Sequence, residues 1–236
     1  MKCEDCRARS AAIYCTAAGS ELEEVAQARL RVEQFEKGAM IVADEAKSAH
    51  VFTLRSGWAY RYALLGDGRR QILDFFGEGD FLTLGMLAGS RVRSAVRALT
   101  VVTVCRFARE SLLAVIDRHP HLRRGVLAHL RSQQERADRR CLRLGALNAE
   151  EAVASLILEF ARRSGAEDED GDIVPFPLTL SLIADAIGIT EIHAGRIVRG
   201  LERAGAIERL KGNRLRLDPD RLQARLRRVD IVAALG

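Results

Sequence analysis

The sequence predicts a mixed α+β fold in which a strand-rich part, one long helix and a second helical part follow one another. Short β-rich pieces separated by glycine turns occupy residues 31–107. Residues 121–147 contain no proline and consist largely of good helix formers. Beyond them, two amphipathic segments on either side of Gly188 precede two short basic strands. At 236 residues the chain is long enough for two domains with separate cores.

The N-terminal segment, residues 1–20, is rich in cysteine. Cys3, Cys6 and Cys15 have the spacing C-x2-C-x8-C, and the apolar core of a signal peptide is missing. The whole chain lacks a run of about 18 apolar residues, which a membrane-spanning helix needs. We therefore expect a cytoplasmic protein without a membrane partner. Its cysteines should be reduced there, which favours metal binding or redox chemistry over disulfides.

Residues 21–120 are expected to form a domain built mainly of β-strands. Examples of the expected strands are residues 51–54, 59–62, 71–75 and 100–104. Glycine turns such as Gly66-Asp67-Gly68 recur between them about every ten residues. This pattern predicts an all-β sandwich or barrel-like roll. A helix over residues 109–118, closed by His119-Pro120, should follow the roll.

Residues 121–147 are expected to form a dimerisation helix. Apolar or small side chains recur along it at helical spacing, with a break at Gln134, and charged residues occupy the other faces. The side chains of this stripe are Val126, Leu130, Ala137, Cys141 and Leu144. So narrow a stripe is typical of a two-stranded coiled coil and predicts a homodimer, with a long core helix of a monomer as the alternative. We expect Cys141 to be a small buried thiol in that contact.

Residues 148–236 are expected to form a winged helix-turn-helix domain. One amphipathic helix carries the small Ala184 where a second helix must pack closely. Gly188 supplies the turn, and Thr190 can cap the second helix. Residues 206–217 then form a basic hairpin, the wing. Two adjacent core helices of an enzyme could imitate the helix pair, but they would rarely add a basic wing.

The basic excess of the chain lies near its C-terminus. Residues 176–236 contain eleven Lys or Arg and seven Asp or Glu, a net charge of +4 out of +5 for the whole chain. Such asymmetry favours a polyanion partner, and with a winged helix-turn-helix we expect that partner to be double-stranded DNA. The residues expected to contact DNA are Thr190, His193, Arg196, Arg199, Lys211 and Arg214.

An enzyme is the competing class of protein. The sequence has no paired catalytic carboxylates, no phosphate-binding loop and no nucleophile elbow. Its five histidines are scattered, and none lies in a catalytic motif. We therefore do not expect an enzyme.

The order of roll, long helix and winged helix-turn-helix resembles the CRP/FNR family of bacterial transcription regulators over essentially the whole chain. The motifs that carry the resemblance are Leu54-Arg55-Ser56-Gly57, Gly77-Glu78-Gly79-Asp80-Phe81, Asn148-Ala149-Glu150-Glu151 and the helix-turn-helix with Gly188 and Arg196. The resemblance implies that residues 21–120 are a sensor domain with a double-stranded β-helix fold, a jelly roll like that of cyclic-nucleotide-binding domains. It further implies a homodimer on a two-fold-related DNA site, with RNA polymerase as a partner.

The cyclic-nucleotide branch of this family carries a glycine-Glu-Leu motif for the ribose hydroxyl and an Arg-Ser-Ala for the phosphate. This chain has Arg93-Ser94-Ala95, but the earlier position reads Leu82-Thr83-Leu84-Gly85. The carboxylate that would accept the hydrogen bond from the hydroxyl is therefore missing. We expect no cyclic nucleotide.

The oxygen-sensing iron–sulfur (FNR) branch is more similar to this chain. Its members carry a cysteine group near the N-terminus and a further cysteine at the end of the last roll strands, where this chain has Cys105. The resemblance implies a 4Fe–4S cluster held by the thiolates of Cys3, Cys6, Cys15 and Cys105, and a switch by oxygen or redox state. The gap before Cys15 is longer than is usual in that branch.

Other interpretations of the cysteines stay open. Four cysteine ligands can form a structural zinc site, and an exposed thiolate can act as a redox sensor without any metal. The regulator could also respond to a small molecule, with Cys105 as an ordinary core residue on its strand.

DNA recognition should depart from the pattern of many relatives, which carry Glu-x-x-Ser-Arg on the second helix. The matching positions here are Ile192, Gly195 and Arg196. The arginine is kept, and we expect it to contact a guanine. The glutamate is lost, so the DNA site should differ. His193 is expected to contact a base or a phosphate, or else to be a solvated helix residue.

Overall fold

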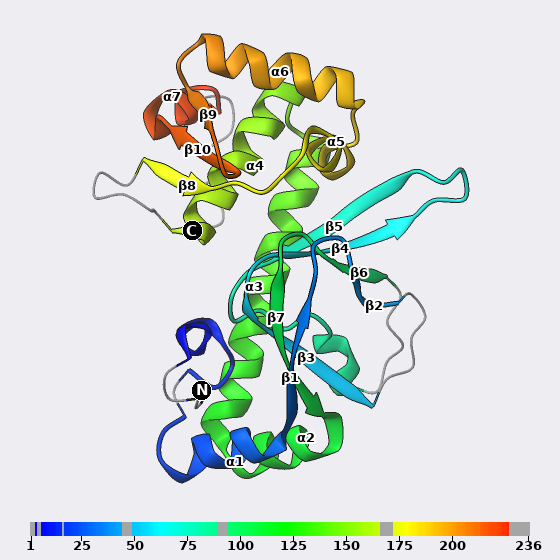
Figure 1. The fold of residues 1–236 in the computed structure, drawn as a ribbon, viewed down its shortest axis with the longest axis vertical. Helices are drawn as coiled ribbons and strands as arrows, with labels where there is room; N and C mark the ends of the chain where they lie inside the picture. Colours follow the sequence, from blue (N-terminus) through cyan, green and yellow to red (C-terminus); the bar gives the residue numbers. More distant parts are fainter. Residues whose placement is uncertain are drawn as a thin grey trace. The chain divides into compact units, whose positions relative to one another are not determined.

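The computed structural model describes residues 3, 6–15, 17–43, 49–88, 94–165 and 172–226 of the chain. Contacts divide the chain into two compact units, unit 1 with residues 1–134 and unit 2 with residues 135–236 (Figure 1). Unit 1 contains helices and two sheets and unit 2 contains helices and one sheet, which confirms the predicted α+β class.

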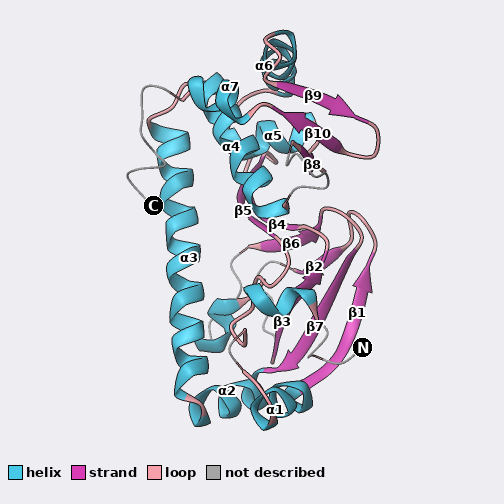
Figure 2. Ribbon diagram, turned by 90° about the vertical axis from the view of Figure 1, so that its left-hand side faces the viewer, coloured by secondary structure: helices cyan, strands magenta, loops and turns pink. Residues whose placement is uncertain are grey.

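Unit 1 is built on two antiparallel sheets that follow a short helical N-terminal region. The N-terminal region contains the 3-10 helix η1 (Arg7–Ala11) and the α-helix α1 (Ser20–Ala28), and a second 3-10 helix, η2 (Leu84–Ala88), lies between two of the strands. The strands are β1 (Arg29–Phe35), β2 (Met40–Val42), β3 (His50–Ser56), β4 (Ala59–Leu64), β5 (Arg70–Phe76), β6 (Ala95–Ala98) and β7 (Val102–Ala108). One sheet has the order β1-β7-β3 and the other β2-β6-β4-β5, which confirms the predicted roll (Figure 2).

Apolar side chains of both sheets meet in the core of unit 1. Leu54, Phe76, Val104 and Phe107 are each at most 1% exposed. Burying a side chain of this size stabilises a fold by roughly 1.5–3 kcal/mol. Cys105 of β7 belongs to the same core cluster, so its thiol lies inside the protein.

Two helices follow the roll, α2 (Arg109–Arg118) and α3 (Pro120–Gly145). Pro120 begins α3, and a first helical turn tolerates proline because its missing N–H would have no intrahelical partner there. α3 is a single helix of 26 residues, close to the predicted bounds of 121–147.

None of the helices in the described part of the chain is both long and apolar enough to cross a membrane.

Unit 2 combines four further helices with a small sheet, as a winged helix-turn-helix requires. The helices after α3 are α4 (Ala149–Ser164), α5 (Leu180–Ile187), α6 (Glu191–Arg203) and α7 (Pro219–Ala224). The strands β8 (Ile173–Pro175), β9 (Ile207–Leu210) and β10 (Arg214–Leu217) form an antiparallel sheet in the order β8-β10-β9. The predicted wing hairpin is β9–β10, and β8 is a third strand that was not predicted.

The helix starts in unit 2 follow local capping rules. The side chain of Asn148 accepts a hydrogen bond from the Glu151 N–H at 3.0 Å, and the Glu151 carboxylate accepts one from the Asn148 N–H at 2.9 Å. This reciprocal pair is a capping box and fixes the start of α4. The hydroxyl of Thr190 accepts from the N–H of His193 at 3.2 Å, as predicted for the cap of α6.

Candidate nucleic-acid interface and thiol site

The second helix of the helix-turn-helix, α6, has one buried and one exposed face. Ala194, Val198 and Leu201 are at most 4% exposed and pack inside unit 2. The exposed residues of this helix are Glu191, Ile192, His193, Arg196, Arg199 and Arg203. The structure therefore places the predicted contacts His193, Arg196 and Arg199 at the surface of the helix whose start Thr190 caps.

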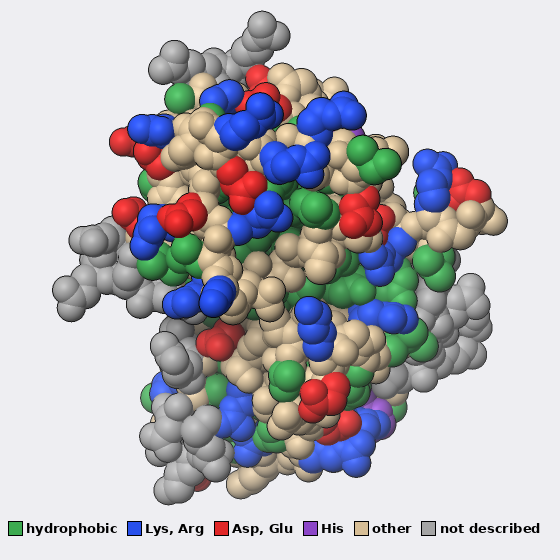
Figure 3. Space-filling view, turned by 45° about the horizontal axis from the view of Figure 1, so that its top comes forward, with side chains coloured by type: hydrophobic (Ala, Val, Ile, Leu, Met, Phe, Trp, Pro, Cys, Tyr) green, Lys and Arg blue, Asp and Glu red, His purple; other side chains and the backbone are tan. Residues whose placement is uncertain are grey.

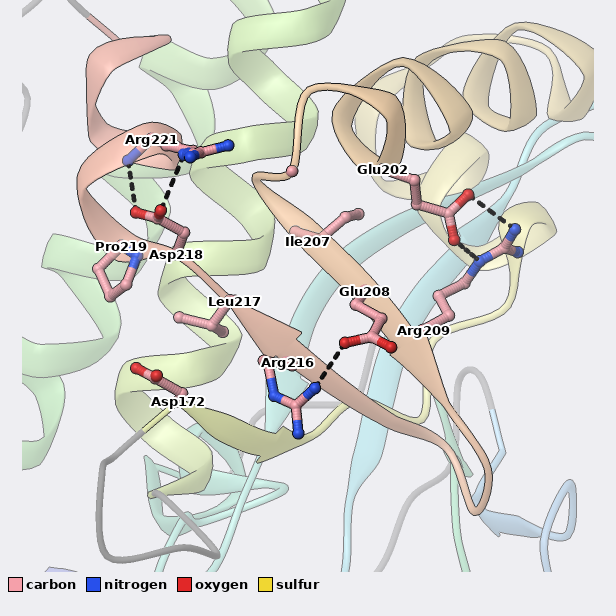
Figure 4. A pocket seen from close by; sticks show the side chains of 11 residues that line it. Asp172, Glu202, Ile207, Glu208, Arg209, Arg216, Leu217, Asp218, Pro219 and Arg221 are labelled. Atoms are coloured by element: carbon pink, nitrogen blue, oxygen red, sulfur yellow. Dashed lines mark hydrogen bonds and ion pairs between the residues drawn. The ribbon is translucent and has the colours of Figure 1, made fainter.

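The guanidinium groups of α6 differ from those of the wing in their partners. Arg209 pairs with Glu202, and Arg216 pairs with Glu208, both at 2.6 Å (Figure 4). Among the described residues, no carboxylate pairs with Arg196 or Arg199. These two cations are therefore available to an external anion, whereas Arg209 and Arg216 of the wing are largely neutralised within the protein.

The predicted wing contacts lie at the turn between β9 and β10. Lys211 and Arg214 are both exposed, and Arg214 Nε donates a hydrogen bond to the backbone carbonyl of Lys211 at 3.1 Å. Lys and Arg side chains are frequent over the upper part of the molecule, where α6 and the wing lie, with Asp and Glu among them (Figure 3). A surface of this kind attracts the phosphates of nucleic acid without selecting a sequence.

Three of the four predicted metal ligands share one neighbourhood in unit 1. Arg29 Nη1 donates a hydrogen bond to the Cys3 sulfur at 3.3 Å. Burial raises the pKa of Cys105, while the charge and hydrogen bond of Arg29 oppose that rise and the thiol of Cys6 adds to it. We call Cys3, Cys6 and Cys105 the thiol group.

Tyr14 lies against the thiol group. Burial is the main cause that raises the pKa of Tyr14 far above its usual range, and the charges of Cys105, Cys6 and Cys3 raise it further. Sequence reasoning missed both Arg29 and Tyr14, because nothing in their sequence positions links them to the cysteines.

Cys15 differs from the thiol group in that its side chain is exposed. The described residues contain no set of three or more Cys, His, Asp or Glu side chains arranged to hold a metal ion. The donor chemistry nevertheless fits an iron–sulfur cluster, because soft sulfur ligands are what such clusters require and Arg29 can offset their negative charge. Cys141, which was not predicted as a ligand, is exposed on α3.

The cysteine-bearing segment packs against two glycines of unit 1. A Cβ added to Gly79 would lie 2.5 Å from the Cβ of Ala11, and one added to Gly125 would lie 2.2 Å from the carbonyl oxygen of Ile13. Only glycine permits such close approach of one backbone to another. The segment from Ala8 to Ile13 therefore contacts α3 directly at Gly125.

A second connection reaches α3 through Phe81. The Phe81 N–H donates to Nε2 of the buried His129 at 3.2 Å, and Gln133 Nε2 donates to the Phe81 carbonyl at 3.4 Å. Phe81 follows Gly79 in the turn on which Ala11 packs. The thiol group is thus linked to α3 by two sets of contacts within unit 1.

The predicted dimer stripe is mostly on the surface of α3. Leu130 and Leu144 are 47% and 46% exposed, Cys141 is exposed and Ala137 is half-buried. Val126 packs instead against the core of unit 1, because the helix turns that position towards the roll. Leu127, absent from the predicted stripe, is 64% exposed and continues the spacing of three and four residues from Leu130.

The position of the missing ribose ligand carries no carboxylate. The hydroxyl of Thr83 accepts a hydrogen bond from the Phe52 N–H at 3.2 Å and is buried. Arg93, the predicted remnant of a phosphate motif, lies outside the described residues.

The jelly-roll domain followed by a winged helix-turn-helix places this chain in the class of DNA-binding regulators. The cyclic nucleotide-binding domain family matches residues 32–119, and the Crp-like helix-turn-helix domain family matches residues 151–225. The chain is 33% identical to the nitrogen fixation regulation protein FixK of Bradyrhizobium diazoefficiens, over 94% of this chain and 92% of the relative. It is 28% identical to the transcriptional activator protein FnrL of Cereibacter sphaeroides, over 90% of this chain and 86% of that protein.

The solved structure of FixK2 from Bradyrhizobium japonicum has the same fold. It matches with a TM-score of 0.74 and 26% identity, covering 82% of this chain and 96% of that chain. The chain therefore belongs to the CRP/FNR family of transcription regulators. Its relatives and its fold are those of DNA-binding regulators and not of enzymes.

Proposed function

We propose that this CRP/FNR-type DNA-binding transcription regulator responds to oxygen or redox state through a 4Fe–4S cluster bound by Cys3, Cys6, Cys15 and Cys105. The observation that carries the proposal is the convergence of Cys3, Cys6 and Cys105 on Arg29 and Tyr14. The similarity to FnrL, a transcriptional activator, supports the part of the proposal that concerns transcription regulation. When bound, such a cluster supplies a redox-active iron centre ligated by thiolates.

The chain's own residues have separate tasks in this proposal. The guanidinium of Arg29 lowers the cost of gathering negative thiolates in a largely buried place. Tyr14 fills the space beside them and excludes water. Cys15, which follows Tyr14 directly, supplies the fourth thiolate when the exposed end of this segment folds over the thiol group.

The contacts at Gly125 and Phe81 carry the response to α3. A change at Cys3 or Cys6 shifts the segment from Ala8 to Ile13, whose backbone touches Gly125. Because α3 forms the homodimer in this proposal, the shift changes how the two copies of α6 are aligned on a two-fold-related DNA site. The resemblance to the family further supports RNA polymerase as a partner and a cytoplasmic location.

Thr190, His193, Arg196 and Arg199 contact DNA in this proposal, with Lys211 and Arg214 on the phosphates beside them. Thr190 acts mainly by holding the start of α6. The free guanidinium of Arg196 donates to a guanine, the commonest specific contact in the major groove. No cyclic nucleotide takes part, since Thr83 stands near the position where a carboxylate would be needed.

Burial of Cys105 speaks against a simple thiol switch at that residue. The thiolate is the reactive form of cysteine, and the raised pKa of Cys105 disfavours it in the absence of a metal. A redox response without a cluster would therefore have to act through the more exposed Cys3, Cys6 or Cys15.

Anaerobic purification followed by iron, sulfide and zinc analysis tests the proposal. We expect about four iron and four sulfide per chain, a brown chromophore, and DNA affinity that changes on exposure to air. Cys105→Ser should abolish the chromophore and the effect of air, whereas Cys141→Ser should preserve both. Stoichiometric zinc, or metal-free protein that binds DNA equally with and without air, would show that the cluster proposal is wrong.

A further inference from the structure

Ile192 has a large apolar side chain that is exposed to solvent. It is 76% exposed, the highest value for a large hydrophobic side chain among the described residues. It lies in the first turn of α6, directly after the capped start at Thr190. Its neighbours in the sequence, Glu191 and His193, are polar and exposed. One exposed hydrophobic side chain is ordinary on a protein surface, so what matters is where Ile192 lies, on the helix expected to enter DNA and one turn before Arg196.

The same exposed line of α6 carries three arginines. Ile192, Arg196, Arg199 and Arg203 follow one another at intervals of four, three and four residues, which places them along one side of the helix. All four are exposed, while Ala194, Val198 and Leu201 on the other side are buried. The partner of this line therefore combines negative charge with an apolar group near Ile192.

The packing of α6 prevents Ile192 from turning inward. Ala194 is fully buried, and a Cβ added to the buried Gly195 would already lie 3.4 Å from Leu180 of α5. Rotating α6 to hide Ile192 would expose Ala194 and Val198 and drive the neighbouring backbone into α5. Exposure of Ile192 is thus imposed by the core of unit 2.

We propose that Ile192 recognises the C5-methyl group of a thymine next to the base contacted by Arg196. The inference rests on the DNA-binding function proposed above and adds a specificity-determining residue to it. In the major groove every base edge presents hydrogen-bond donors or acceptors, and only thymine adds an apolar methyl group. Contact of Ile192 with any other edge would strip water from polar groups without replacing the hydrogen bonds.

The spacing along α6 fixes where that thymine lies. Side chains four residues apart on a helix are about 6 Å apart. Stacked base pairs rise by about 3.4 Å, so Ile192 and Arg196 contact bases one or two steps apart. The expected half-site therefore contains a thymine one or two base pairs from a guanine.

Deoxyuridine substitution tests this inference at the level of one methyl group. High-affinity duplexes are first selected from a random pool with the wild-type protein, purified in its cluster-bound or metal-free form, whichever binds DNA. Each thymine of the selected site is then replaced by deoxyuridine, which lacks only the C5-methyl group. Because burial of one methyl contributes about 0.8 kcal/mol, we expect about fourfold weaker binding at one thymine per half-site.

Three variants test whether the preference for thymine comes from Ile192 itself. Ile192→Ala should bind the thymine and deoxyuridine duplexes equally at that position, while Arg196→Ala should keep the preference for thymine. Leu64→Ala removes a leucine of unit 1 that is 66% exposed and should also keep the preference. Circular dichroism of Ile192→Ala checks its fold, which should be intact because the side chain makes little use of the core.

Three results would overturn the inference. The wild type could show no loss at any deoxyuridine, or Ile192→Ala could retain the full loss. The preference for thymine over deoxyuridine could also disappear in a Glu191→Gln variant, which still has Ile192. That result would assign the preference to the Glu191 carboxylate. If selection enriches no sequence at all, the proposed sequence-specific DNA binding fails together with the inference.

Discussion

The carboxylate of Glu159 on α4 pairs with the guanidinium of Arg143 near the end of α3, and both side chains are almost wholly buried. The Ser155 hydroxyl lies 3.4 Å from two nitrogens of the same guanidinium. The last turns of the long helix are thereby fixed to the first helix of the DNA-binding unit. Two buried charges are tolerated there because each compensates the other.

Breaking this pair should destabilise unit 2. In Glu159→Ala the guanidinium of Arg143 stays buried without its carboxylate, and we expect a loss of about 3–5 kcal/mol in the free energy of unfolding. The double variant Arg143→Met/Glu159→Leu, which removes both charges of this pair, should recover most of that loss. Urea unfolding of the two variants and the wild type measures both effects. Equal stability of Glu159→Ala and the wild type would contradict the role of the pair.

The Arg143–Glu159 pair should make the stability of unit 2 depend on pH in the acid range. Burial, the largest single cause, raises the pKa of Glu159, but the charge and hydrogen bond of Arg143 together with the charges of Arg163 and Arg139 outweigh it and hold the pKa below its ordinary value of 4.5. A carboxyl whose pKa is lower in the folded than in the unfolded protein stabilises the fold at pH values above the unfolded pKa. This stabilisation is lost as the pH falls through the folded pKa. The stability difference between wild type and Glu159→Gln should therefore be constant near neutral pH and shrink below about pH 4.5. If the stability difference between wild type and Glu159→Gln instead grows as the pH falls, folding raises the pKa of Glu159 and the assigned direction is wrong.

Gly125 should be intolerant of a side chain for a reason that lies outside α3. Gly125→Val places a Cβ about where the Ile13 carbonyl now lies, so the cysteine segment must move away from the helix. We expect a stability loss of about 1–3 kcal/mol and faster alkylation of Cys105, followed by mass spectrometry of its peptide. Gly145→Ala on the same helix is the matched control, since nothing lies within 4 Å of its added Cβ. Unchanged alkylation in Gly125→Val would mean that the segment does not shield the thiol.

Elements set by neighbouring residues could be predicted from the sequence, and contacts between distant residues could not. The cap at Thr190 and the turn at Gly188 depend on residues within one or two helical turns, and both are as predicted. The contact of Arg29 with Cys3 joins residues 26 positions apart, and no local sequence pattern indicates this contact.

The apolar stripe of α3 shows the same limit of prediction from sequence, here in the choice between two adjacent residues. Val126 and Leu127 are both apolar, and a rotation of about 100° separates them on the helix. Which of the two faces the roll depends on the surrounding fold, and that choice is made by contacts with residues far away in the sequence. Val126 packs against the core and Leu127 is left exposed. β8 was missed for a related reason, because a strand of three residues carries too little periodicity to be recognised.

Arg196 and Arg214 should affect DNA binding in different ways. If Arg196 donates to a guanine, Arg196→Ala should cost about 1–3 kcal/mol on the selected site and relax preference at one base pair per half-site. Arg214→Ala in the wing should weaken all sequences alike and reduce the slope of log affinity against log salt by about 1. Fluorescence anisotropy with selected and random duplexes at several salt concentrations distinguishes the two. Identical behaviour of both variants would refute the division into base and phosphate contacts.

The exposed stripe of α3 should hold two copies of the chain together. Leu127 and Leu130 lie on it at 64% and 47% exposure, and after the break at Gln134 the spacing of three and four residues expected for a coiled coil resumes at Ala137, Cys141 and Leu144. In a two-fold pair, Leu130→Glu places two unpaired like charges at the contact and should weaken the dimer by several kcal/mol. Leu127→Glu should act in the same direction, whereas Leu64→Glu, which changes an exposed leucine at the end of β4, should leave the dimer intact. Sedimentation velocity at micromolar concentration gives the masses, and dimers of unchanged stability in both α3 variants would exclude this stripe as the contact.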